Sequence, residues 1–187
     1  MKVAITGGIG SGKSYVCNLL AERGIKVYDC DAAAKRLMRT SQPLQQKLKR
    51  LVGEDVYINN VLQKSVLAKF ILSSDANKYA VNDIVHPAVA RDFEQSGLDW
   101  LESAILFDSG FDKRTHFDKV VCVTAPLEVR ISRVMQRDGL SREEALEWIG
   151  RQMPQEKVRS LCDFEIVNDG QSDLNKQINL IINKIQY

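Results

Sequence analysis

Lys13 and Ser14 close a glycine-rich stretch near the N-terminus, GGIGSGKSY at residues 7–15. With Gly7 and Gly12 they match the spacing G-x-x-x-x-G-K-[ST], in which the lysine reaches the β- and γ-phosphates and the hydroxyl binds Mg²⁺. Glycines permit backbone conformations closed to other residues, so successive N–H groups can surround an anion. The stretch therefore predicts a nucleoside triphosphate site.

Three classes of nucleotide-dependent protein fit such a loop: a switch GTPase, an ATP-driven motor and a small-molecule kinase. A guanine-specific switch carries an Asn/Thr-Lys-x-Asp element, but the Asn-Lys at 175–176 is followed by Gln-Ile. A motor usually needs a larger chain. A kinase needs an acceptor site, a carboxylate near the acceptor hydroxyl and cations around the phosphates. The rest of the chain must therefore supply those groups if it is a kinase.

Asp29 and Asp31 follow a short β-leaning run, Ile25–Tyr28. Ligands of a doubly wound sheet gather at the carboxyl ends of its strands, which would place this pair beside the phosphate loop. One carboxylate could accept the proton of an attacking hydroxyl. Asp31 could instead cap the helix expected at Ala32–Met38. The residues alone leave both interpretations open.

Three further groups are candidates. Asp108 closes the apolar run Ala104–Phe107 and is either a strand-end acid that holds a Mg²⁺-bound water or a generic carboxylate. His86-Pro87 interrupts a helical pattern, and His86 either contacts substrate or marks a helix break. Six arginines crowd one region and form either a closing lid on the phosphates or a solvated charged face: Arg130, Arg133, Arg137, Arg142, Arg151 and Arg159.

The elements that must position these residues follow from the apolar pattern. Strands are predicted at Lys2–Thr6, Ile25–Tyr28, Ala104–Phe107, Val120–Thr124 and Phe164–Val167. Helices are predicted at Ser14–Arg23, Ala32–Met38, Leu44–Leu51, Lys64–Leu72, Asn77–Val85, Ala88–Gln95, Leu127–Gln136, Ser141–Ile149 and Leu174–Ile185. Alternating strands and helices indicate an α/β fold with a parallel sheet. Helical insertions are expected at about 40–97 and, Arg-rich, at about 133–159.

The length and net charge of the chain limit the number of domains and the classes of partner that it can have. The 187 residues favour one domain, and the net charge of +2 is too small to predict a nucleic-acid or membrane surface. No apolar run reaches the ~18 residues of a membrane span. Only six residues precede the glycine loop, so we expect no secretory signal and a cytoplasmic protein.

With these residues in hand, the sequence resembles the dephospho-CoA kinase family nearly end to end. TGGIGSGKS (6–14) is similar to the family's phosphate loop and VYDCD (27–31) to its V-x-D-x-D element. HP (86–87), QRDGLSREEALEWIGRQ (136–152) and DFEIVNDG (163–170) resemble its acceptor-side His-Pro, its lid and its final strand with an Asn-x-Gly turn. Five elements in the family's order make this resemblance more specific than the loop alone.

The resemblance implies a P-loop kinase fold with a five-stranded parallel sheet, in which core segments at about 1–39, 98–132 and 160–187 carry an acceptor-binding insertion (40–97) and a lid (133–159). It implies transfer of the ATP γ-phosphate to the ribose 3′-hydroxyl of dephospho-CoA. Catalysis would rest on Asp31, Lys13 and Arg137, with Arg151 a weaker lid candidate. ATP would contact Gly8, Ile9, Gly10, Ser11, Gly12, Lys13, Ser14, Tyr15, Arg137 and Asn168.

The acceptor would contact Asp31, Lys35, His86 and Asp108, and Ser14 would bind Mg²⁺. The expected partners are ATP and dephospho-CoA, without nucleic acid or membrane, for a monomer or small homo-oligomer. The sequence departs from the family at Tyr15, where Thr is usual, at Lys35, where Arg is common, and at Ala104 and Asp108, where Pro and Glu are common. Lys35 keeps the charge but loses the bidentate fork of arginine.

Overall fold

A computed structural model describes residues 1–186 of the chain. The chain divides into two compact units. One unit joins Met1–Tyr28 to Leu98–Tyr187, and the other is the continuous segment Asp29–Gly97. Each unit is described by itself.

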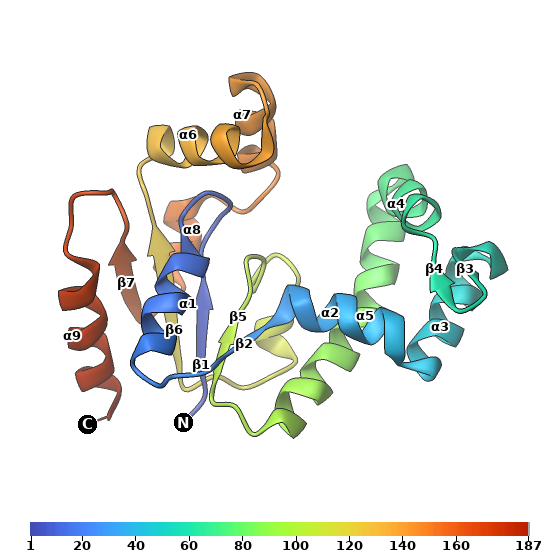
Figure 1. Ribbon diagram of the computed structural model, residues 1–187, viewed down its shortest axis with the longest axis horizontal. Helices are drawn as coiled ribbons and strands as arrows, with labels where there is room; N and C mark the ends of the chain where they lie inside the picture. The colour runs from blue at the N-terminus through green and yellow to red at the C-terminus, as the bar shows by residue number, and fades with distance from the viewer. Residues whose placement is uncertain (187) are drawn as a thin grey trace. The chain divides into compact units, whose positions relative to one another are not determined.

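A five-stranded parallel sheet forms the centre of the first unit (Figure 1). Its strands are β1 (Val3–Thr6), β2 (Val27–Asp29), β5 (Trp100–Glu102), β6 (Lys119–Thr124) and β7 (Phe164–Val167), in the spatial order β2-β5-β1-β6-β7. Ile5 pairs with Glu102 on one side of β1 and with Val121 on the other. The chain leaves β1 between two strands reached later in sequence, and ligands of doubly wound sheets bind at the carboxyl ends of strands at such a point.

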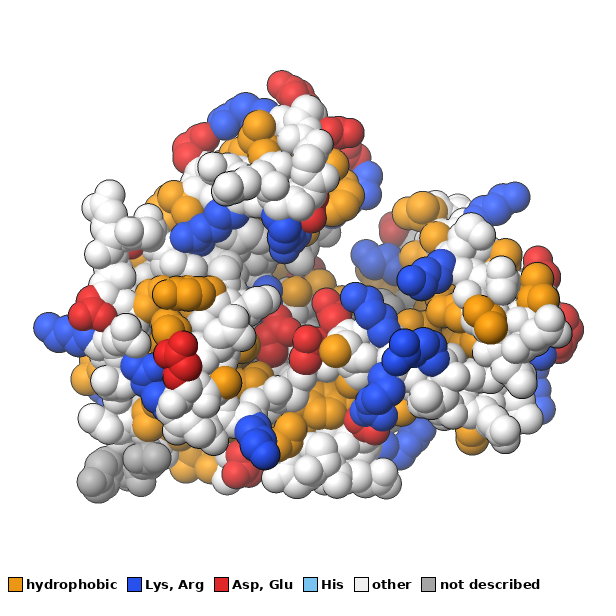
Figure 2. All heavy atoms as spheres, in the orientation of Figure 1, with side chains coloured by type: hydrophobic (Ala, Val, Ile, Leu, Met, Phe, Trp, Pro, Cys, Tyr) orange, Lys and Arg blue, Asp and Glu red, His pale blue; other side chains and the backbone are white. Residues whose placement is uncertain are grey.

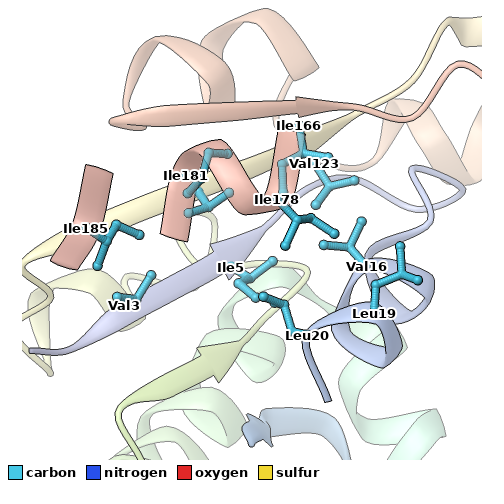
Figure 3. Packing of buried hydrophobic residues seen from close by; sticks show 11 residues of the cluster. Val3, Ile5, Val16, Leu19, Leu20, Val123, Ile166, Ile178, Ile181 and Ile185 are labelled. Atoms are coloured by element: carbon cyan, nitrogen blue, oxygen red, sulfur yellow. The ribbon is translucent and has the colours of Figure 1, made fainter. Parts of the chain in front are cut away.

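The core of this unit lies between the sheet and two helices, α1 (Lys13–Glu22) and α9 (Leu174–Gln186). Figure 3 shows Ile5 of β1 close to Leu20 of α1 and Ile178 of α9, and Val3 and Val16 belong to the same buried cluster. All are 4% exposed or less. The continuous apolar strands are typical of a sheet buried on both faces. This packing fixes where the glycine loop between β1 and α1 begins and ends.

Three further helices follow β6: α6 (Leu127–Asp138), α7 (Arg142–Gly150) and α8 (Gln155–Ser160). Ser141 and Glu144 form the capping box that their spacing predicts, each side chain accepting the other's backbone N–H. The outer face of α6 and α7 carries acidic and basic side chains side by side (Figure 2). A mixed surface of this kind produces no single-sign field.

The second unit is helical, with α2 (Cys30–Thr40), α3 (Gln42–Val52), α4 (Lys64–Ser73) and α5 (Asp75–Ser96). The other three helices pack on α5. A short 3₁₀ turn (Glu54–Val56) leads into a two-stranded hairpin of β3 (Tyr57–Ile58) and β4 (Val61–Leu62). Its turn residues, Asn59 and Asn60, both have positive φ, as a type I′ hairpin turn requires.

Two expectations from the sequence are wrong. Ala104–Phe107 is not a strand, because the edge of the sheet is supplied by Trp100–Glu102 and the following apolar run forms turns. Leu106 in that run is fully buried, so core packing without strand pairing explains its apolar character. A second 3₁₀ turn, Phe111–Lys113, lies between this segment and β6.

His86-Pro87 does not break its helix either, because α5 runs through it. The buried positions Val81, Val85, Val89 and Phe93 keep one four-residue spacing on both sides of the proline. Proline inside a helix costs about 3 kcal/mol, and here one continuous buried face offsets that cost. His86 is therefore a helical residue.

Candidate active site

The glycine loop adopts the conformation that its sequence predicts. Gly7, Gly10 and Gly12 have φ of 147°, 78° and 87°, and α1 begins immediately after Gly12. A Cβ on Gly7 would lie 2.3 Å from the carbonyl oxygen of Val123, and one on Gly12 would lie 2.1 Å from Nδ2 of Asn168. Both the backbone angles and the lack of space therefore require glycine at these positions.

Side chains from α6 and from the end of β7 bind the outward-facing carbonyls of the loop. Arg133 Nη1 donates to the oxygens of Gly10 and Ser11 at 3.3 and 3.2 Å. Asn168 Nδ2 donates to Ser11 O at 2.9 Å, and its Oδ1 accepts from Arg133 Nη2 at 3.2 Å. Since these carbonyls have protein donors, the conformation of the loop is set before any nucleotide binds.

Ile9, which precedes Gly10 in the loop, has both its backbone N–H and its carbonyl bound by side chains. Its N–H donates to Gln152 Oε1 at 2.7 Å, and its carbonyl accepts from Arg130 Nε at 2.9 Å. Arg130 is 5% exposed, and burial lowers the pKa of its guanidinium. Arginine stays charged under ordinary conditions, so this is a fixed positive charge beside the loop.

Lys13 points toward the sheet. Its Nζ lies 3.5 Å from Oε1 of Glu102, the last residue of β5, and both side chains are largely buried. Glu102 is thus the strand-end acid of this site, a place that the sequence assigned to Asp108. Ser11 Oγ is also buried in the loop and has no protein hydrogen-bond partner among residues 1–186.

Two candidates predicted near the phosphates have other contacts in this unit. Arg137 pairs with its neighbour Asp138 at 2.7 Å, and its side chain is 60% exposed. Their hydrogen bond raises the pKa of Arg137 and lowers that of Asp138. Asp108 Oδ1 accepts the backbone N–H of Met153 at 2.9 Å. The roles predicted for Arg137 and Asp108 remain predictions.

The acceptor-side candidates Asp31, Lys35 and His86 belong to the second unit. Asp29 is the N-cap of α2, because its Oδ1 accepts the N–H of Ala32 at 2.9 Å. The interpretation of Asp31 as the cap is therefore wrong. Asp31 is exposed in the first turn of α2, and Lys35 lies four residues later on the same face.

Four contacts of the loop were not assigned from the sequence: those of Glu102, Arg130, Arg133 and Gln152. The arginines were recognised as a group, but only their three-residue spacing hinted that Arg130 and Arg133 share a face. Glu102 has a usable signal, because it is a carboxylate directly after the apolar pair Trp100-Leu101. Among residues 1–186, no group of three or more His, Cys, Asp and Glu side chains could hold a metal.

Comparisons with known proteins agree on one family. The sequence model of dephospho-CoA kinase matches residues 1–173. A dephospho-CoA kinase of Bacteroides fragilis is 40% identical over 185 residues, which cover 95% of this chain and 89% of that protein. One of Porphyromonas gingivalis is 41% identical over 194 residues, covering 98% and 94%. A crystal structure of TT1252 from Thermus thermophilus, 34% identical, superposes with a TM-score of 0.84 over 100% of this chain and 98% of that one.

Proposed function

The chain belongs to the dephospho-CoA kinase family, and we propose that it transfers the γ-phosphate of ATP to the ribose 3′-hydroxyl of dephospho-CoA, giving coenzyme A and ADP. The observation that carries the donor half is the loop from Gly7 to Ser14, whose glycine angles and bound carbonyls form an anion nest at the start of α1. The proposal that dephospho-CoA is the acceptor rests on membership of the family.

On the donor side, the loop amides and Lys13 bind the ATP phosphates. Ser14, in the first turn of α1, and Glu102, at the end of β5, are oxygen donors of the kind that Mg²⁺ prefers. Mg²⁺ is usually held by one or two protein groups together with phosphate oxygens and water, so a small donor set fits it. When bound, the ion would neutralise charge on the transferred phosphoryl group.

On the acceptor side, Asp31 accepts or orients the proton of the 3′-hydroxyl, and Lys35 and His86 contact the acceptor. Support for Asp31 comes from its free position in the first turn of α2, since Asp29 and not Asp31 caps that helix. Asp108 is a further acceptor-side candidate. Asn168 and Tyr15 complete the nucleotide side, and Arg137 is the predicted lid arginine.

None of the described helices is long and apolar enough to cross a bilayer. Together with the small net charge, this fits the proposal of a cytoplasmic enzyme that acts on small molecules, as a monomer or small homo-oligomer. The proposed partners are ATP and dephospho-CoA alone.

The test is ADP release with a panel of acceptors: dephospho-CoA, a nucleoside monophosphate, shikimate, gluconate and water alone. We expect dephospho-CoA alone to stimulate release strongly over the rate with water. Stimulation by another acceptor in its place would overturn the acceptor assignment. Tight nucleotide binding with slow hydrolysis and no stimulation would point to a nucleotide-dependent switch.

A further inference from the structure

Arg130 differs from the carboxylate-paired arginines that follow it. Arg137, Arg142, Arg151 and Arg159 each pair with a carboxylate, and all are exposed. Arg130 is the most buried of the group, and no carboxylate within the described part of the chain pairs with it. A buried charge without a counter-charge destabilises the folded protein. A functional role would explain why such a charge is present here.

The hydrogen bonds of Arg130 leave most of its donors for a ligand. A guanidinium has five N–H donors in a rigid planar fork. Within residues 1–186, the side chain makes one protein hydrogen bond, from Nε to Ile9 O. The donors on Nη1 and Nη2 therefore have no protein acceptor in that range. Arg133, by contrast, uses its two Nη atoms on Gly10, Ser11 and Asn168.

The position of the guanidinium is fixed on the loop itself. A Cβ on Gly8 would lie 2.4 Å from Arg130 Nη2 and 3.3 Å from Gln152 Oε1. The side chains of Arg130 and Gln152 therefore meet in the space that a side chain on residue 8 would occupy. A Cβ on Gly10 would lie 2.6 Å from the carbonyl oxygen of Arg130. The backbone of α6 therefore touches the loop, and this contact together with the hydrogen bond to Ile9 O holds Arg130 beside it.

We propose that Arg130 is a phosphate-binding residue of this kinase, a preset counter-charge for the terminal phosphate of ATP. This inference rests on the proposed function, because it names a further contact of the same donor site. The free guanidinium donors match phosphate oxygens, which arginine binds in a planar, two-point manner. Gln152 supports the arrangement by binding the Ile9 N–H, so that Ile9 is fixed from both sides.

The experiment compares Arg130→Gln with the matched control Arg142→Gln, which removes an arginine paired with Glu128 farther along the same segment. Affinities for ATP and AMP are measured by calorimetry, and melting temperatures are measured without nucleotide. For Arg130→Gln we expect ATP binding to weaken about tenfold or more, as for a hydrogen bond to a charged group. AMP binding should change less than about threefold, and the melting temperature should hold or rise because a buried charge is removed. The control should leave both affinities unchanged.

Two results would overturn the proposal: unchanged ATP affinity in Arg130→Gln, or equal weakening of ATP and AMP with a lower melting temperature, which marks a purely structural clamp. If Arg130→Gln does not fold, NMR of the ¹⁵N-arginine-labelled unsubstituted protein replaces it. The Nε resonance of Arg130 is assigned as the signal that is missing from the spectrum of Arg130→Lys. A shift of that resonance with ATP but not AMP supports the proposal, and no shift with ATP overturns it. Dephospho-CoA-stimulated ADP release by the unsubstituted protein is measured alongside, and its absence would reject the proposed function instead.

Discussion

The two units of the chain present their predicted functional residues in different ways. In the phosphate-loop unit, the middle of the loop is held by side chains from distant segments, such as Asn168 on Ser11 and Arg130 on Ile9. In the Asp29–Gly97 unit, the predicted catalytic group Asp31 is an exposed carboxylate in a first helical turn. In the proposed reaction, the donor side is thus preorganised by the fold, whereas the acceptor side is expected to depend on single side chains.

This difference implies that substitutions in the two units should separate in kinetics. Changes in the loop should alter ATP binding and turnover together. Changes at Asp31 or Lys35 should leave ATP binding intact and alter turnover or acceptor affinity. Substitutions at Asp31, Lys13, Gly12 and Lys35 separate the two kinds of effect.

Asp31→Asn should lower turnover by about 10²–10⁴-fold, because it removes a general base or orienting carboxylate. Calorimetric ATP affinity should stay within about twofold of the unsubstituted value. Asp29→Asn is the matched control, since asparagine is as good an N-cap as aspartate and turnover should hold. Normal turnover in Asp31→Asn would show that Asp31 is neither the base nor the orienting carboxylate.

Lys13→Ala should lower turnover by about 10²–10³-fold, the usual effect of losing one group that stabilises developing charge. ATP binding should weaken in the same variant, because Lys13 is also expected to bind the phosphates before transfer. The substitution leaves Glu102 buried without its cation, so the melting temperature is measured alongside. Wild-type ATP affinity would contradict the assignment of the loop.

Gly12→Ala should weaken ATP binding about tenfold or more. The residue has φ of 87°, and its new Cβ would lie 2.1 Å from Asn168 Nδ2, so the loop must move. Gly170→Ala is a control with similar strain, because Gly170 has φ of 84° and nothing lies within 4 Å of its Cβ position. It should lose stability without losing ATP affinity. Equal ATP affinities in the two variants would show that the loop tolerates repacking.

Lys35→Gln should have the smallest effect, a rise of a few-fold in the KM for dephospho-CoA, because exposed ion pairs contribute about 0.2–1 kcal/mol. Turnover at saturation and ATP affinity should not change. Lys69→Gln removes another exposed lysine of the same unit and should change neither constant. If both variants raise the KM equally, the effect comes from the reduced positive charge of the unit. A direct contact between Lys35 and the acceptor would then be rejected.

The sequence predicted best what depends on neighbouring residues. The glycine loop is local, and its conformation follows from glycines at fixed offsets before a helix. The capping box at Ser141 and Glu144 is local in the same way. These features need no knowledge of the tertiary structure.

What the sequence could not supply depends on segments far apart in the chain. Arg130 meets Ile9 across 121 residues, and Gln152 meets it across 143. The strand predicted at Ala104–Phe107 failed because an apolar run can be buried as turns as well as in a sheet. The cap of α2 moved from Asp31 to Asp29 because the helix begins two residues earlier than its apolar pattern indicates.

The activity proposed for this chain is transfer of one phosphoryl group from ATP to the 3′-hydroxyl of dephospho-CoA. The most direct measurement is the product itself, identified by mass spectrometry and ³¹P NMR after incubation with MgATP and dephospho-CoA. We expect dephospho-CoA to gain one phosphate, as a 3′-phosphomonoester, in an amount equal to the ADP formed. ADP formed beside unchanged dephospho-CoA, or phosphate on another hydroxyl, would contradict it.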